Sequence, residues 1–159
     1  MTPEEFERAF NSRTLAYTPE FGSDDRPVVV VIGDGAYNAV GHLLAASLTN
    51  MLSRAHRRLV FIGDLGREFV GQNPFGHRTL AEATIGLARA INPHIDVVQL
   101  DAQPTPRLVS IGIAADADLR LGADGWCAII GADAAVQDDA VSFLGAGLAA
   151  ILAAASAFH

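Results

Sequence analysis

A buried strand that runs directly into a glycine-bearing turn is the feature that most limits how this chain can fold. Residues 28–32 read VVVVI, a continuous β-branched run that is typical of a strand covered on both faces. The next residues, IGDGAYNAVG (32–41), place Gly33 and Gly35 ahead of a helical pattern. A strand, a glycine turn and a helix in this order begin a nucleotide-binding α/β unit. The sequence therefore raises the question of whether this turn holds a nucleotide.

Apolar periodicity after the turn predicts alternating helices and strands. From Val40 to Ala55, apolar residues recur at a spacing of three to four, which predicts a helix of several turns. The next predicted elements are a strand in LVFIGD (59–64), a helix in TLAEATIGLARAI (79–91) capped by Thr79, and a turn and strand in NPHIDVVQLD (92–101). Strands that alternate with helices favour a mostly parallel sheet with helices on its faces.

The remaining segments complete an α/β fold, which we expect to be Rossmann-like and three-layered. The further predicted elements are a fourth strand in RLVSIGI (107–113), an antiparallel hairpin around GADG within residues 117–131, a C-terminal helix over 142–158, and a short first helix in residues 2–10 with a threonine cap. Residues 18–27 read as a polar linker. We therefore divide the chain into an N-terminal helix and linker (1–26) and one Rossmann-like domain (27–159).

Charge and composition exclude several classes of function. The 159-residue chain has a net charge of −7, and without a basic stripe nucleic acid is not an expected partner. It contains no lysine, which removes Schiff-base chemistry and the phosphate-binding lysine of P-loops. A single cysteine, Cys127, allows no internal disulfide, and we expect it to be buried in a strand. No apolar run has membrane-spanning length and no signal peptide is evident, so no membrane association and a cytoplasmic location are expected.

The candidate binding residues follow the first two strands. Gly33 fits the glycine that makes the tight turn, and Gly35 fits the one that lets the backbone approach a phosphate. Asn38 occupies the third position of the motif and is suited to cap the helix. Asp64, after the second strand, is placed to hold ribose hydroxyls or magnesium. The full candidate set for cofactor binding is Gly33, Asp34, Gly35, Asn38, Asp64, Arg67 and Arg78. An empty turn with the same local structure remains the alternative.

Several stretches taken together resemble the ThiF/MoeB-like family of adenylation domains, which includes ubiquitin-activating enzymes. The order VVVVIGDG, helix, LVFIGD, loop and TLAEATIGLARAINPHIDV carries the resemblance, and RAINPHIDV is its most specific part. The resemblance extends from Val28 to the end of the chain, including the late FLGAGLAAILAAASAFH. It implies an activity in which a protein's C-terminal carboxylate attacks the α-phosphate of Mg-ATP to give an acyl adenylate.

The sequence departs from that family where catalysis needs cations. After Asp64 there is no Asn-x-x-Arg-Gln motif, and the usual lysine position reads GHRT; Arg67 and Arg78 are the nearest arginines. Adenylation concentrates negative charge on phosphate oxygens, so it requires cations or magnesium. The resemblance therefore implies a degenerate domain that acts as a non-catalytic binding or scaffold partner and binds nucleotide weakly at most.

Two other functions remain open at this level. One is an ATP-dependent adenylyltransferase, with ATP and Mg as cofactors, that another chain or a missing segment completes. The other is a dinucleotide-dependent oxidoreductase, which ranks last because no tyrosine–lysine or cysteine–histidine set is evident. We expect a homodimer or a protein partner that binds through the C-terminal helix. Its small residues Gly145, Gly147, Ala149 and Ala150 would permit close backbone approach if they were exposed.

Overall fold

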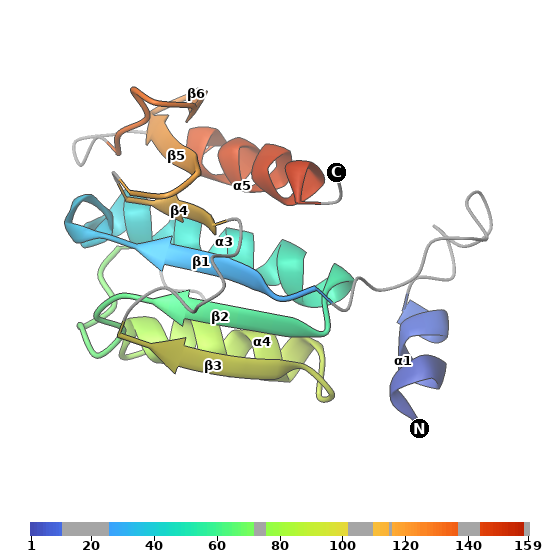
Figure 1. Ribbon diagram of the computed structural model, residues 1–159. Helices are drawn as coiled ribbons and strands as arrows, with labels where there is room; N and C mark the ends of the chain where they lie inside the picture. The colour runs from blue at the N-terminus through green and yellow to red at the C-terminus, as the bar shows by residue number, and fades with distance from the viewer. Residues whose placement is uncertain (11–25, 72–75, 102–109, 115, 137–143, 158–159) are drawn as a thin grey trace.

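The chain forms a six-stranded sheet with helices packed against one face, as the ribbon diagram shows (Figure 1). The computed structural model describes residues 1–10, 26–71, 76–101, 110–114, 116–136 and 144–157. The strands are β1 (Val28–Ile32), β2 (Arg58–Ile62), β3 (Asp96–Leu100), β4 (Ser110–Ile113), β5 (Leu119–Asp124) and β6 (Cys127–Ile130). The helices are α1 (Pro3–Phe10), α3 (Ala39–Ala55), α4 (Leu87–Ile91) and α5 (Leu144–Ser156), with a 3-10 turn η1 (Asp34–Ala36) and a π-helical turn η2 (Glu82–Gly86).

The strand order β3-β2-β1-β4-β5-β6 places β1 near the centre of the sheet. The first five strands are parallel neighbours, and only β5 and β6 pair antiparallel. The chain leaves β1 toward β2 and β3 on one side and returns to β4 on the other side. In sheets of this kind, ligands bind outside the carboxyl ends of the strands where the order reverses, which here lies between β1 and β4.

The central strands of the sheet are buried on both faces. On one face α3 packs between α4 and α5, and the largest buried cluster joins these helices to alternate strand residues such as Val30, Phe61 and Ile111. On the opposite face a smaller cluster contains Val29, Val31, Val60 and Ala117. The run VVVVI is buried along its whole length because its side chains alternate between these two clusters.

The structure confirms the predicted α/β fold, with its mostly parallel sheet and late antiparallel pair. β1 has the predicted bounds, and two helix starts carry the predicted side-chain caps. The Thr2 hydroxyl accepts from Glu5 N–H at 3.2 Å, and the Thr79 hydroxyl accepts from Glu82 N–H at 3.3 Å. The hairpin turn lies at Gly125 and Trp126 and not at GADG (122–125), because β5 continues to Asp124.

Some sequence predictions concern residues outside the described part of the chain. These are the linker over 18–25, the start of the predicted fourth strand at 107–109, and both ends of the predicted C-terminal helix at 142–143 and 158. Within the described part, β4 begins at Ser110 and α5 covers Leu144–Ser156.

The prediction that Cys127 is buried is wrong. Cys127 does lie in a strand, but β6 is at the edge of the sheet and the side chain is exposed. Cys127 is paired with Asp124, one register position away from the pair of Ala123 and Ala128. Ala123 and Ala128 belong to the cluster on the helix side, so Cys127 points toward the opposite face.

Helix α5 buries most of its small residues and exposes its large apolar ones. Its small residues could form an oligomer seam only if they were exposed, and Gly145, Ala149 and Ala150 do not meet this condition because they are buried. They face inward because α5 lies close to α3 and β6: a Cβ added at Gly145 would lie 2.3 Å from the carbonyl oxygen of Cys127. The large apolar residues of α5 therefore point outward. They are Leu144 (59% exposed), Leu148 (46%), Ile151 (50%) and Leu152 (44%).

Candidate functional site

The glycine turn closes tightly over the end of β1. Gly33 N–H donates to the carbonyl oxygen of Ile113 at 3.1 Å, and a Cβ added at Gly33 would lie 2.9 Å from the Cβ of Ala114. The turn therefore sits directly against the end of β4, where the strand order reverses. Around Gly35 there is open space, since no atom lies within 4 Å of an added Cβ. Gly35 thus leaves its backbone accessible, as its predicted role requires.

Gly41 performs the close-packing role of the third motif glycine. A Cβ at this position would lie 2.3 Å from the carbonyl oxygen of Ala36, so the first turn of α3 packs directly on η1. Asn38, which occupies the motif's third position in sequence, is instead the N-cap of α3. Its Oδ1 accepts from Gly41 N–H at 2.8 Å and its Nδ2 donates to the carbonyl oxygen of Gly35 at 3.3 Å.

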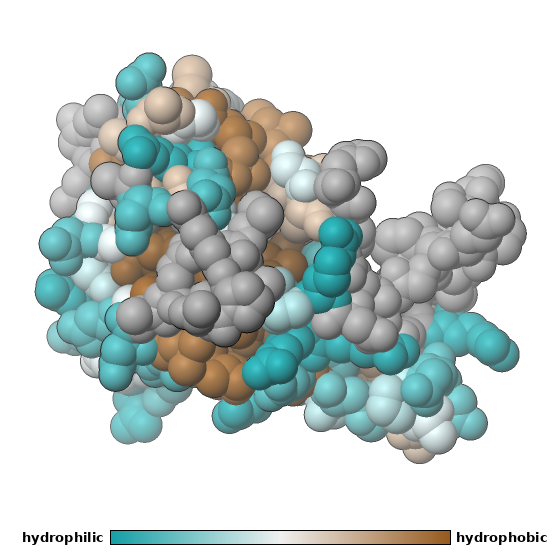
Figure 2. All heavy atoms as spheres, viewed as in Figure 1, coloured by the Kyte–Doolittle hydropathy of each residue, from teal (hydrophilic) through white to brown (hydrophobic). Residues whose placement is uncertain are grey.

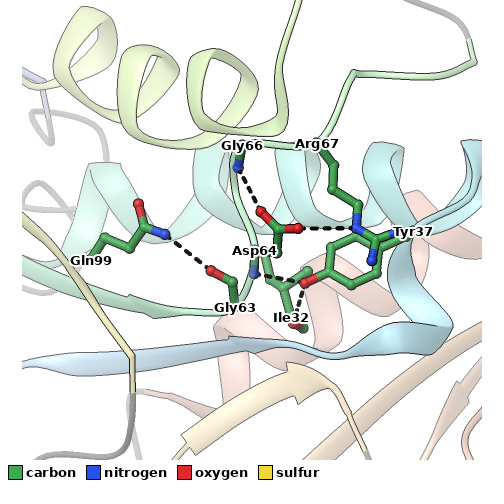
Figure 3. A network of polar contacts seen from close by, with 7 residues as sticks. All are labelled: Ile32, Tyr37, Gly63, Asp64, Gly66, Arg67 and Gln99. Carbon is green, nitrogen blue, oxygen red and sulfur yellow. Dashed lines mark hydrogen bonds and ion pairs between the residues drawn. The ribbon is translucent and has the colours of Figure 1, made fainter.

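A tyrosine hydroxyl joins the ends of β1 and β2. Tyr37 donates to the carbonyl oxygen of Ile32 at 3.2 Å and accepts from Asp64 N–H at 2.7 Å (Figure 3). The side chain of Tyr37 therefore lies between the glycine turn and the residue predicted to hold a ribose. Its position in the sequence, inside a turn and without periodic apolar neighbours, gave no signal of this role.

Asp64 and Arg67 form an ion pair beside Tyr37. Arg67 Nε lies 3.2 Å from Asp64 Oδ2, and Gly66 N–H donates to Asp64 Oδ1 at 3.2 Å. The guanidinium carbon of Arg67 lies 4.2 Å from the centroid of the Tyr37 ring, in a cation–π arrangement. Figure 3 shows the three side chains converging from the segment after β1 and the segment after β2. Both carboxylate oxygens of Asp64 thus have a donor from its own loop.

Gly63 sets the direction of the loop that carries Asp64. Its φ of +139° is a conformation that side chains disfavour, and an added Cβ would lie 2.3 Å from the carbonyl oxygen of Ile32. Gln99 on β3 donates from its Nε2 to the carbonyl oxygen of Gly63 at 3.1 Å. The carboxyl ends of three adjacent strands are therefore tied together at this point. We call Gly33, Tyr37, Gly63, Asp64 and Arg67 the carboxyl edge.

Arg78 is directed to a different partner. Its Nη2 lies 3.2 Å from Glu82 Oε1, and its N–H donates to Glu82 Oε2 at 2.7 Å. The backbone hydrogen bond from Arg78, followed by its side chain, lowers the pKa of the Glu82 carboxyl. The Arg78 side chain is 87% exposed. Arg78 thus lies on the segment paired with Arg67 and Phe69 but does not join the carboxyl edge.

A buried histidine lies behind the edge. His42 is 1% exposed, and its Nδ1 accepts from Val70 N–H at 3.1 Å. Because Nδ1 is the acceptor, the neutral ring carries its proton on Nε2, for which the described residues provide no hydrogen-bond partner. Burial, and then the charge of Arg67, lower the pKa of His42. Sequence reasoning assigned His42 no role, since it found no second ligand at metal spacing.

The structure brings together only part of the predicted set. Gly35 and Asn38 are hydrogen-bonded, and Asp64 and Arg67 form an ion pair. Asp34 is exposed in η1, where its carbonyl oxygen accepts from Tyr37 N–H at 3.3 Å. Across the described ranges, no three histidine, cysteine or acidic side chains are grouped to hold a metal ion.

The electrostatics of the carboxyl edge are poorly suited to a triphosphate. A phosphate chain would meet the exposed Asp34 near the turn, and the single nearby cation of the predicted set, Arg67, is already paired with Asp64. Removing that pairing to bind phosphate would leave the carboxylate beside a second negative group. The open backbone at Gly35 and the first turn of α3 can still accept a small anionic or polar group.

Comparison of the sequence with protein-family models and with curated proteins finds no match. Among the described residues, no helix combines the length and apolarity that crossing a membrane requires.

Proposed function

We propose that this chain is a degenerate ThiF-type, Rossmann-like domain that works as a non-catalytic binding or scaffold partner. The supporting observation is that the polar groups of the carboxyl edge are paired with one another. Asp64 forms an ion pair with Arg67, and the Tyr37 hydroxyl lies between the glycine turn and Asp64. Adenylation needs cations that are available to a developing phosphate charge. Here the cations of the predicted set are engaged with carboxylates, and the chain has no lysine.

The proposal assigns binding to a protein surface and leaves the glycine turn with weak affinity for nucleotides at most. The large apolar residues that α5 exposes support this assignment, because such residues gathered on one helix face mark interaction sites. The working alternative is an adenylyltransferase that receives cations from another chain. It requires Arg67 to exchange Asp64 for a phosphate.

Thermal unfolding with ligands tests the proposal. A nucleotide at about 100 times its dissociation constant would add about 2.7 kcal/mol of stability. We expect 1 mM Mg-ATP or NAD (roughly a saturating dose for a working site) to shift the melting temperature by less than about 2 °C. Gly35→Val is the matched control, because the open space around Gly35 accommodates the side chain without a clash while blocking the approach of phosphate.

An enzymatic measurement distinguishes the alternative. ATP–pyrophosphate exchange is measured with the purified chain and an acceptor peptide that ends in a free carboxylate. The proposal predicts exchange no faster than in the Gly35→Val control. A large thermal shift together with exchange that Gly35→Val abolishes would replace it with the adenylation function.

A further inference from the structure

On the exposed face of α5, Leu144 and Ile151 are placed symmetrically about the point between Gly147 and Leu148, whereas the mirror position of Leu152 is residue 143, outside the described part of the chain. We name Leu144, Leu148, Ile151 and Leu152 the α5 outer face. Gly147 lies among these residues, and no atom approaches within 4 Å of a Cβ added there, so it forms an open notch beside the side chain of Leu148. Reading outward from the point between Gly147 and Leu148, the next outer-face residues are Leu144 on one side and Ile151 on the other.

That symmetry matches a twofold helix pair. In two antiparallel helices related by a twofold axis between residues 147 and 148, Leu148 of each copy faces Gly147 of the other, and Leu144 faces Ile151. Each contact then combines a knob with a notch, or two large apolar side chains. An unrelated partner would need to supply the complementary notch, whereas a second copy already contains it.

Two further large apolar residues are exposed close to α5, one in β6 and one in the turn that precedes it. Trp126 is 72% exposed in the turn before β6, and Gly145 N–H at the start of α5 donates to the adjacent Gly125 carbonyl at 3.0 Å. Ile130 is 37% exposed and lies opposite Leu121, a member of the helix-side cluster, so it is on the same side of the sheet as α5. Figure 2 shows apolar residues gathered over α5.

The size and charge of this surface fit an isologous interface. At about 200 Å² for each fully exposed large side chain, the six apolar residues expose about 600 Å², against about 800 Å² per partner in a standard interface. Residues 125–131 and 144–157 contain no charged side chain, although the chain as a whole carries −7. Two copies can therefore meet here without placing like charges in contact.

We propose that a second copy of this chain docks on the α5 outer face through a twofold axis between Gly147 and Leu148, with Trp126 and Ile130 at the rim. This inference rests on the proposed function, since it names the partner of the binding surface assigned there. It places the dimer contact on the helix layer, away from the carboxyl edge.

Sedimentation of the full chain at 1–100 µM (about the range of moderate affinities) tests the inference. We expect a dimer in the unmodified chain and a monomer in Leu148→Glu and in Gly147→Glu. Gly86→Glu is the matched control, because Gly86 has almost empty surroundings, as Gly147 does, but is exposed in η2 at the far side of α3. It should remain dimeric. Unchanged circular dichroism in all three variants shows that the fold is retained.

Cross-linking tests the register of the pair. In a Cys127→Ser background, chains with Leu144→Cys are mixed with tagged chains carrying Ile151→Cys and oxidised with copper phenanthroline. We expect disulfide-linked pairs in the mixture and far fewer from either chain alone. A monomer at every concentration, a dimer that survives Leu148→Glu, or cross-links independent of mixing would overturn the inference. None of these results requires pyrophosphate exchange, so a failure here is distinguishable from a failure of the proposed function.

Discussion

The carboxyl edge and the α5 outer face differ in the kind of side chain that they present to solvent. At the carboxyl edge the groups are polar and paired: Asp64 pairs within its own loop with Gly66 and Arg67, and the Tyr37 hydroxyl joins the two loops. On the α5 outer face the exposed groups are large and apolar, while most of the small residues of the same helix are buried. The sequence predicts a ligand site at the carboxyl edge, yet the polar groups there are already paired with one another. The region that its sequence suggests as a packing helix presents an unusually apolar surface.

This difference shows that motif position and binding capacity are separate properties. The turn after β1 has the backbone features that the glycine pattern predicts, because Gly33, Gly35 and Gly41 provide a tight turn, an open approach and close packing. Beside the turn, the charge of Arg67 is paired with that of Asp64, and Asp34 adds a further negative charge. Geometry comes from backbone constraints, whereas affinity for phosphate requires unpaired positive charge.

The largest expected effect comes from breaking the backbone packing of the turn. Gly41→Val should destabilise the fold by about 3 kcal/mol, because its side chain would collide with the Ala36 carbonyl. Urea unfolding followed by circular dichroism measures the loss. Gly35→Val, whose surroundings are open, should change stability by no more than about 0.5 kcal/mol. Equal losses in the two variants would contradict the assignment of close packing to Gly41.

Removing one hydroxyl tests how strongly the carboxyl edge is tied together. Tyr37→Phe should cost about 1–2 kcal/mol, since it removes both the donor to Ile32 and the acceptor for Asp64 N–H. Amide hydrogen exchange at Asp64 should become faster in the same variant. Protection that is unchanged at Asp64 would mean that the bridge does not hold the end of β2.

Acidification should weaken the contact between α3 and the loop after Arg67. The pKa of His42 is lowered below 6.5 in the folded chain, so the unfolded chain binds more protons between the two values. Stability is therefore present above pH 6.5 and decreases as the pH falls below it, by about 1.4 kcal/mol per pH unit at most. His42→Asn retains an acceptor for Val70 N–H, and its stability should fall less between pH 7.5 and 5. A fall as steep as in the unmodified chain would assign the acid sensitivity to other groups.

The smallest effect concerns the α5 outer face. Gly147→Ala should stabilise the folded monomer by about 0.5–1 kcal/mol, because alanine favours a helix and the site has room for a methyl group. The measurement is made in the Leu148→Glu background, so that only folding contributes. A loss of stability would show that the notch is closed within the monomer.

The sequence alone was sufficient for most of the fold. A strand buried on both faces requires a continuous apolar run, which identifies β1. A helix buried along one stripe requires apolar residues at a spacing of three to four, which identifies α3. Asn38 and Thr79 were recognisable as caps because unpaired helix N–H groups favour short polar side chains at those positions. The candidate residues of the glycine turn were found for the same reason, since tight turns depend on local backbone conformation.

Only the tertiary structure decided which candidates meet and which face of α5 is exposed. Tyr37 and Asp64 are 27 positions apart, and no local pattern records a hydroxyl that bridges two strand ends. Composition indicated that α5 is apolar and rich in small residues, but its orientation depends on how closely α3 and β6 approach it. Local preferences fix the elements. The distances between those elements determine which side chains are buried, paired or left in solvent.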